Sequence, residues 1–248
     1  MKKGWKYLLA ATGLTLFLCV VALVVDSSHA RRHLVTCNNI DIRFHDTLAF
    51  LSADDVRAVL DRECPSLIGQ RIDSVRLGSI EEILEEKSAV RSAEAWVSSD
   101  GVLHIGIVQR DPVAKLVHGN SICFMDAEGF IFPMQGNCTK EIPVFEGQFP
   151  TEGKAKSEIM ELIRYMDRHS LSKRFPLIEI SPGGSLTLHP SAGPETIVFG
   201  SATSIEEKFS KIATYYKSIR PAEEAEQYRY VNVRYKGQII CRKKAKTK

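Results

Sequence analysis

Val90-Arg-Ser-Ala-Glu-Ala-Trp-Val97 and Val102-Leu-His-Ile-Gly-Ile-Val108 are two runs in which apolar and polar residues alternate, and Ser98-Ser-Asp-Gly101 separates them. Alternation with a period of two is typical of β-strands that bury one face. Asp100-Gly101 is a strong hairpin signal, because a tight primed turn needs residues that tolerate positive φ. The sequence therefore predicts an antiparallel hairpin over residues 90–108.

A strand and two helices are predicted on the N-terminal side of this hairpin. Residues 34–44 are expected to form a strand, since their apolar side chains alternate with polar ones. Ser52 is expected to cap a helix that runs to about Glu63. The capping-box pattern Ser79-Ile-Glu-Glu82 predicts the start of a second, shorter helix. The order β-α-α-β-β over about 75 residues predicts a small α+β module, residues 34–110, with two helices packed on one sheet face.

The chain from Asp111 onward has a different character and predicts a second unit, residues 111–241, built of mixed and mostly antiparallel β-structure with helices between groups of strands. Short strands are expected at 113–117, 121–125, 130–132, 177–180, 186–188, 196–199, 230–235 and 238–241. Helices are expected at 155–169 and from the capping-box pattern Ser204-Ile-Glu-Glu207 to about Ile219, with Phe209, Ile212 and Tyr216 facing inward. Pro182-Gly-Gly184 is expected to form a hairpin turn.

Residues 7–25 contain no charged side chain. As a helix they would cover roughly 28 Å, close to the thickness of a bilayer core, so they predict a single transmembrane helix behind a short cytoplasmic N-terminus, residues 1–6. Three lysines in residues 1–6 favour an orientation in which the bulk of the chain lies outside the cytoplasm. A cleaved signal peptide is the alternative, because Ser28-His29-Ala30 has the small-x-small pattern of a cleavage site.

The charge distribution argues against a nucleic-acid partner. Eight of the 33 Lys and Arg residues lie before residue 7 or in the tail 242–248, which leaves 25 in the body against 30 Asp and Glu residues. A domain that binds duplex nucleic acid usually carries a concentrated basic face. The basic tail is interpreted as a solvated end of the chain.

Motifs that carry catalysis or metal binding are hard to find. The sequence has no C-x-x-C pair, no G-x-S-x-G elbow and no phosphate loop, so no cofactor, metal or small-molecule substrate is expected. His45-Asp46 is expected to be a polar surface pair, and His104 to face solvent from the middle of a strand. Cys123 and Cys138 flank a predicted turn, and two outcomes stay open for them: a disulfide or free thiols.

Several motifs together resemble the FtsQ/DivIB family of bacterial cell-division proteins. Residues 90–97, followed by Leu103-His-Ile-Gly-Ile-Val-Gln-Arg-Asp-Pro-Val-Ala114, are similar to that family's hairpin and its ER.PVA step, with Gln109 in place of Glu. Asp126-Ala-Glu-Gly-Phe-Ile-Phe132 matches the D..G..F element that follows. Further matches, in the family's order, are Ile142-Pro-Val-Phe-Glu-Gly147, Phe199-Gly200 ahead of Lys208, and Tyr230-Val-Asn-Val-Arg-Tyr235, in which Asn232 replaces Asp.

The resemblance implies a POTRA domain over residues 34–110 and the family's β domain over 111–241. It also implies a non-catalytic membrane-anchored scaffold at the division septum, in the inner (plasma) membrane with its bulk periplasmic or otherwise extracytoplasmic.

The resemblance further implies that partners of the FtsB/FtsL type dock at the C-terminal edge, where an extended partner can join a terminal strand by β-augmentation. On the matching positions the predicted partner-binding residues are Arg234, Tyr235, Gln238, Ile239 and Ile240. Tyrosine and arginine suit anchoring roles, because each gives a large contact area and a polar tip. The alternatives are a core-packed ring for Tyr235 and an ordinary surface charge for Arg234.

Two other functions stay open. A POTRA-bearing assembly or secretion factor predicts association with an outer-membrane barrel. An extracytoplasmic enzyme predicts a pocket with clustered titratable groups, and such convergence is invisible in a sequence.

Overall fold

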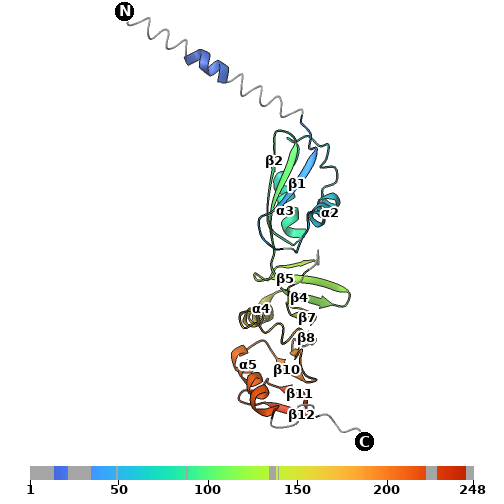
Figure 1. Cartoon of the computed structure of the whole chain (residues 1–248), viewed down its shortest axis with the longest axis vertical. Coiled ribbons are helices and arrows are strands. Elements are labelled where there is room, and N and C mark those ends of the chain that lie inside the picture. The colour runs from blue at the N-terminus through green and yellow to red at the C-terminus, as the bar shows by residue number, and fades with distance from the viewer. Residues whose placement is uncertain are drawn as a thin grey trace, which may run out of the picture. The chain divides into compact units, whose positions relative to one another are not determined.

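The computed structural model describes residues 14–21, 35–48, 50–87, 89–133, 138, 140–221 and 228–243 (Figure 1). The chain divides into two compact units. Unit 1 takes in the chain up to Thr47 and Ser52–Gln109, and unit 2 takes in Leu48–Leu51 and the chain from Arg110 onward. Residues 14–21 of the predicted membrane span are helical, and its other residues lie outside the described ones. Within the described part of the chain, no helix combines the length and the apolar character that a bilayer crossing requires.

Unit 1 has the order β-α-α-β-β, so the prediction is confirmed. Its elements are β1 (Asn39–Phe44), α2 (Ala53–Glu63), α3 (Leu77–Lys87), β2 (Val90–Val97) and β3 (Val102–Gln109). The sheet order is β1-β3-β2, with β1 parallel and β2 antiparallel to β3. The core of the unit is built from aliphatic residues of both helices and of β3, namely Val56, Val59, Leu60, Ile80, Leu84, Leu103, Ile105 and Ile107.

Local sequence signals in unit 1 are correct in two cases and wrong in one. Ser52 caps α2 in a capping box with Asp55. The hairpin forms as predicted, but its turn is not a primed one: Gly101 N donates to Ser98 O, the central residues Ser99 and Asp100 do not have positive φ, and the positive φ falls at Gly101 (+87°). A Cβ at Gly101 would collide with the carbonyl oxygen of Thr36. The capping box predicted at Ser79 is wrong, because α3 begins at Leu77 and Ser79 lies inside its first turn.

Unit 2 is built on one mixed sheet of nine strands in the order β12-β11-β10-β9-β8-β7-β4-β5-β6. The strands are β4 (Pro112–His118), β5 (Ser121–Asp126), β6 (Ile131–Pro133), β7 (Val144–Gly147), β8 (Leu177–Ile180), β9 (Leu186–His189), β10 (Thr196–Gly200), β11 (Tyr228–Asn232) and β12 (Ile240–Lys243). Neighbours are parallel at β4–β7, β7–β8 and β10–β11 and antiparallel elsewhere, so the predicted mixed, mostly antiparallel unit is confirmed.

Helical crossovers account for two of the three parallel pairs, β7–β8 and β10–β11, whereas β4 and β7 are joined through β5 and β6. Helix α4 (Gly153–Arg168) joins β7 to β8, and α5 (Ile205–Thr214) with the π-turn η1 (Tyr215–Ile219) leads from β10 toward β11. Figure 1 shows α4 and α5 on the same side of the sheet. They bury apolar stripes against it, and Ile159, Leu162, Met166, Phe209 and Ile212 belong to the core.

Unit 2 differs from the sequence predictions at Ser204 and in detail at η1, has one strand that was not predicted, and decides the open question of Cys123 and Cys138. Ser204 is not a side-chain cap, because its backbone is left-handed (φ +51°) and its hydroxyl makes no capping bond. At the π-turn η1, Tyr215 is fully buried, and the predicted Tyr216 is half-buried and packs against the core. Strand β7 was not predicted as a strand. Cys123 and Cys138 are both free thiols.

Candidate functional site

Strand β12 is the outermost strand at one end of the nine-stranded sheet. It pairs antiparallel with β11, with Cys241 opposite Val231 and Ile240 opposite Asn232. In such a pair, every second residue of the edge strand directs its N–H and C=O away from the sheet. These groups are the template onto which an extended chain can add as a further strand.

The five predicted residues lie along this edge and the turn that leads into it. Arg234, Tyr235 and Gln238 are exposed in the connection between β11 and β12, and Ile240 is the first residue of β12. Tyr235 is 51% exposed and Ile240 is 39% exposed, so neither ring nor aliphatic chain belongs to the core. Ile239 differs, because it is half-buried and packs against the core.

The turn between β11 and β12 is held by α5. Lys211 Nζ donates to the carbonyl oxygen of Tyr235 at 2.7 Å, and Gly237 N donates to Glu207 Oε1 at 3.1 Å. Lys211 and Glu207 also lie 3.3 Å apart as an ion pair. The Gly237 N–H bond, followed by the contact with Lys211, lowers the pKa of Glu207. The α5 side chains thus fix the turn that presents Tyr235 and Gln238.

Asn232 orders the start of the same connection. Its Oδ1 accepts from Arg234 N at 3.0 Å and from Arg234 Nε at 3.3 Å, and its Nδ2 donates to the Tyr230 hydroxyl at 3.0 Å. The aliphatic part of Arg234 passes over Gly200, where a Cβ would collide with it. Arg234 is therefore exposed but oriented, with its guanidinium 5.5 Å from the centre of the Tyr235 ring.

Two motif residues quoted from the sequence form a buried pair at the start of unit 2. Arg110 Nη1 lies 2.8 Å from Asp126 Oδ2, and both side chains are almost fully buried. Asp126 also accepts from Phe130 N at 2.9 Å, and the Arg110 guanidinium lies 3.8 Å from the centre of the Phe130 ring. The cluster therefore joins the Arg and the Asp of these motifs, while the Phe of the D..G..F element is Phe132, which is buried beside Phe124. Lys208 is buried as well, donates to Ser201 O at 2.7 Å, and has its pKa lowered by burial.

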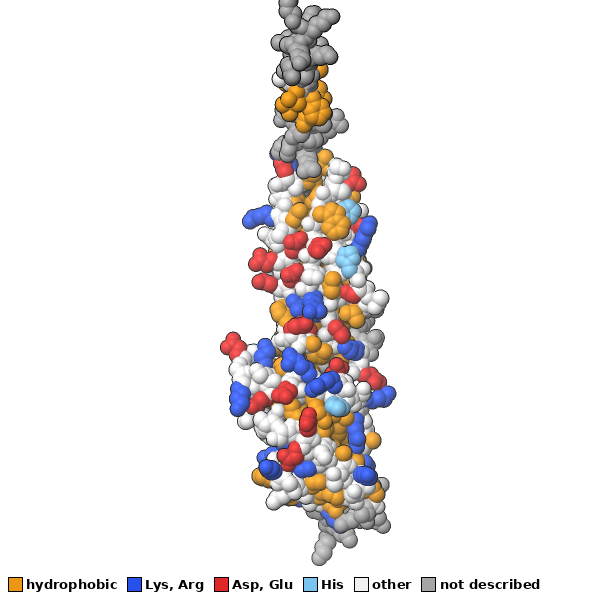
Figure 2. Space-filling model, turned by 90° about the vertical axis from the view of Figure 1, so that its left-hand side faces the viewer, with side chains coloured by type: hydrophobic (Ala, Val, Ile, Leu, Met, Phe, Trp, Pro, Cys, Tyr) orange, Lys and Arg blue, Asp and Glu red, His pale blue; other side chains and the backbone are white. Residues whose placement is uncertain are grey.

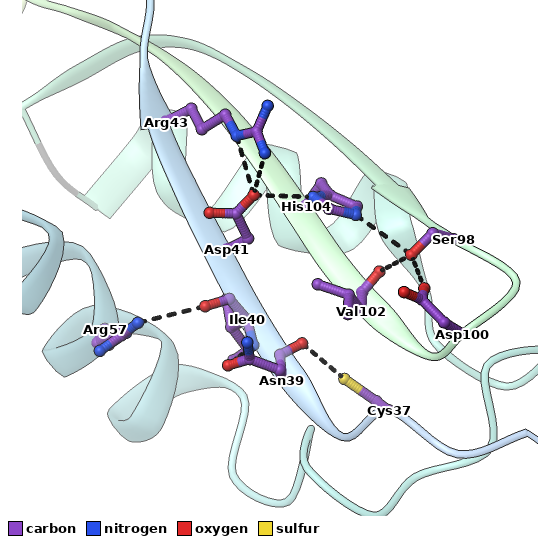
Figure 3. Close-up of polar contacts among 10 residues, drawn as sticks. All are labelled: Cys37, Asn39, Ile40, Asp41, Arg43, Arg57, Ser98, Asp100, Val102 and His104. Atoms are coloured by element: carbon purple, nitrogen blue, oxygen red, sulfur yellow. Dashed lines mark hydrogen bonds and ion pairs between the residues drawn. The ribbon is translucent and has the colours of Figure 1, made fainter.

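Unit 1 contains one constellation with the order of an acyl-transfer triad (Figure 3). His104 Nδ1 lies 3.0 Å from Asp41 Oδ2, and His104 Nε2 lies 3.2 Å from Ser98 Oγ. The expectation that His104 faces solvent is wrong, since its side chain is 18% exposed and stacks on Trp96. The hydrogen bond from His104 lowers the pKa of Asp41.

Two features of this constellation favour a structural role. The Ser98 hydroxyl is engaged by the Asp100 carboxylate and the Val102 carbonyl oxygen, so His104 does not hold it alone. A nucleophile also needs a cleft for its substrate. Two clefts of about 530 and 650 Å³ lie in unit 2, around the N-termini of α4 and α5, and Ser98 lines neither. We interpret the constellation as a network that orders one face of the unit 1 sheet.

Comparisons with known sequences bear on both units. The sequence model of the family described as FtsQ/DivIB, C-terminal related, matches residues 111–242. A second model, described as a POTRA-like domain, matches residues 35–108. A search of curated proteins finds no match.

Proposed function

The chain belongs to the FtsQ/DivIB, C-terminal related family, whose model covers more than half of it, and on this premise we propose that it is a non-catalytic scaffold of the bacterial division septum. A single N-terminal span anchors it in the inner membrane, with both units on the extracytoplasmic side. The scaffold docks membrane proteins of the division complex, of the FtsB/FtsL type, by strand addition at β12.

The observation that supports strand addition is the position of β12 at the end of the sheet, next to a turn that α5 holds in place. A partner strand would gain main-chain hydrogen bonds from β12, and these give affinity with little sequence preference. Specificity would come from the exposed side chains beside the edge. Tyr235 and Arg234 offer a ring and a guanidinium, the two groups most often found in interface hot spots.

Substitution of Ile240 tests this docking mode. Ile240→Glu places a charge where an apolar partner side chain would pack, and Ile240→Pro removes a donor and distorts the edge. We expect both variants to capture the FtsB/FtsL-type partner at least about tenfold less well in pull-downs from membranes, a loss typical of an interface hot spot. The melting temperature of each variant, followed by circular dichroism, should stay near that of the wild type, because Ile240 is partly exposed.

Ile122→Glu provides the matched control. Ile122 is 38% exposed on β5, near the opposite end of the same sheet, so its substitution makes the same chemical change away from β12. This variant should capture the partner normally. Capture of wild-type strength by Ile240→Pro would contradict strand addition at β12.

A further inference from the structure

Four polar residues of unit 2 lie close together near the beginnings of β10 and β11. Glu195 directly precedes β10, Tyr215 and Tyr216 belong to the π-turn η1, and Arg220 follows η1. The Tyr215 ring centre lies 6.2 Å from that of Tyr228, the first residue of β11. Tyr215 is fully buried, and Glu195 is 2% exposed with no accessible side-chain surface. Polar and charged groups are costly in such positions unless they are hydrogen-bonded.

These side chains carry buried polar atoms that make no hydrogen bond within the described part of the chain. They are both carboxylate oxygens of Glu195, the hydroxyls of Tyr215 and Tyr216, and Nε of Arg220. In native proteins, most buried polar atoms have a hydrogen-bond partner, which is either a protein group or an ordered water molecule. A group of such atoms in one place therefore indicates a shared partner.

Distances and charges place these atoms around the Glu195 carboxylate. Glu195 Oε1 lies 3.6 Å from Arg220 Nη1, which allows an ionic attraction but is too long for a hydrogen bond. The ring centres of Tyr215 and Tyr216 are 5.1 Å apart. Burial, followed by the nearby Glu195 carboxylate, raises the pKa of Tyr215 to about 12 and raises the pKa of Tyr216 as well. Both hydroxyls therefore keep their protons at neutral pH and can act as donors.

The surrounding chain separates the Glu195 carboxylate from bulk solvent. The backbone at Gly193 passes so close to Glu195 that a Cβ there would collide with the carboxylate. The Arg174 guanidinium covers Tyr216, 4.2 Å from the centre of its ring. Figure 2 shows many Lys, Arg, Asp and Glu side chains at the surface of the protein, where bulk water can bind them. Glu195 has no such access, so a water molecule that binds it must be held inside the protein.

The charges in the cluster favour a neutral partner. A bound cation would be repelled by Arg220 and Arg174, and a bound anion would be repelled by Glu195. An apolar molecule would leave the carboxylate and the hydroxyls without hydrogen bonds. Water is neutral, accepts from hydroxyl and N–H groups, and donates to carboxylates. A buried water molecule typically makes about three such bonds.

We propose that the cluster is an internal water-binding site formed by Glu195, Tyr215, Tyr216 and Arg220. The bound water donates to the Glu195 carboxylate and accepts from a tyrosine hydroxyl and from Arg220 Nε. It thereby connects the loop before β10 to η1, so that the segments preceding the parallel strands β10 and β11 are held together. This site is independent of β12 and of the partners proposed for it.

Tyr215→Phe in the full-length protein, purified in detergent micelles, distinguishes a bonded hydroxyl from an unpartnered one. Removal of a bonded hydroxyl loses a hydrogen bond, whereas removal of an unpartnered buried hydroxyl is neutral or stabilising. We expect the equilibrium constant for unfolding in urea to rise about fivefold, the effect of one typical hydrogen bond. Tyr165→Phe is the matched control, because it makes the same change at a half-buried ring that lines a cleft, and it should leave this constant unchanged.

Oxygen-17 magnetic relaxation dispersion of water measures the bound water directly, because it reports water molecules that stay inside a protein longer than the protein takes to tumble. The double variant Y215F/Y216F removes both hydroxyl donors and keeps the Glu195–Arg220 pair. We expect this variant to hold fewer internal waters than the wild type. Y165F should hold the same number as the wild type.

Equal numbers of internal waters in the wild type and in Y215F/Y216F would overturn the proposal. A Tyr215→Phe variant as stable as the wild type, or more stable, would overturn it too, since the hydroxyl would then have no partner to lose. Lower stability of Y215F/Y216F with no loss of internal water would mean that the hydroxyls bond directly to Glu195, which also contradicts a water-binding site.

Discussion

A single side-chain atom of Gln109, the amide nitrogen Nε2, decides its side-chain contact with Asp46. Gln109 is 3% exposed, its N donates to Asp46 Oδ2 at 2.6 Å, and its Nε2 donates to Asp46 Oδ1 at 2.7 Å. The motif it resembles has Glu here, so we expect Gln109→Glu to set a buried carboxylate against the half-buried carboxylate of Asp46. Loss of the donor together with the repulsion should destabilise unit 1 by about 2–4 kcal/mol, measured by urea unfolding at pH 7.

Exchange of the two groups should restore the contact. In the double variant D46N/Q109E, the asparagine amide introduced at position 46 donates to the new carboxylate, and the oxygen of the same side chain still accepts from the backbone amide. This variant should recover most of the lost free energy of unfolding. A single Q109E variant as stable as the wild type would show that the Asp46 contact contributes little.

For single residues, the sequence predicted which side chains are exposed better than it predicted the contacts that hold the turn beside them. Arg234, Tyr235 and Ile240 are exposed beside the edge, as their proposed docking role requires. Glu207 and Lys211, which hold the turn, were not predicted, because their contacts with Gly237 and Tyr235 join residues 30 and 24 positions apart. The i, i+4 spacing of Glu207 and Lys211 was a signal in the sequence, but the same spacing is typical of an ordinary ion pair on a helix surface.

Elements with a clear period were predicted well from the sequence. The hairpin of β2 and β3 and the helices α2 and α4 follow directly from alternation or from an apolar stripe. The strand β7 and the π-turn η1 were not predicted, although the equally short strand at 177–180 was. Capping boxes failed at Ser79 and Ser204, since the Ser-x-x-Glu pattern arises equally when glutamates on an exposed helix face have other partners. Glu207, the glutamate of the second pattern, accepts from Gly237 N.

The contact between α5 and the β11–β12 turn should depend on pH. The pKa of Glu207 is lowered, so the stabilisation it gives is present above the unfolded-state pKa, about 4.3, and is lost as pH falls through the folded-state value. We therefore expect the protection factor of the Gly237 amide in hydrogen exchange to decline below about pH 4.

Glu207→Gln is the control for this pH dependence. The glutamine side chain has an acceptor of similar geometry but does not titrate, so protection of Gly237 should be the same from pH 7 to pH 3. A wild-type protection factor that stays constant over this range would mean that Glu207 does not hold the turn.

The whole molecule combines a POTRA-like unit and an FtsQ/DivIB-related unit, which are also the two units into which the structure divides. The nine-strand order could not have been predicted from the sequence. Strand β7 lies between β4 and β8 in the sheet, although β5 and β6 separate it from β4 along the chain. Such an order depends on long-range pairing and crossovers, which hydrophobic periods do not encode.

Localisation in dividing cells tests the proposed role at this scale. A fusion of a fluorescent protein to the N-terminus of the full chain should concentrate at midcell and fractionate with the inner membrane. A uniform membrane signal would count against a septal scaffold. Release of the fluorescent part from the rest of the chain would instead show that the N-terminal segment is cleaved as a signal peptide.

The hydrogen bonds from α5 to the β11–β12 turn also bear on the thermodynamics of docking. Since Lys211 and Glu207 hold Tyr235 O and Gly237 N in the free protein, the conformational entropy of this turn is lost during folding, before any partner arrives. Association then needs little further ordering on this side of the interface, and a preorganised surface of this kind binds more tightly for the same buried area. The entropy lost on forming the complex then comes mainly from ordering the extended partner. The flexibility of that partner before binding therefore sets the affinity.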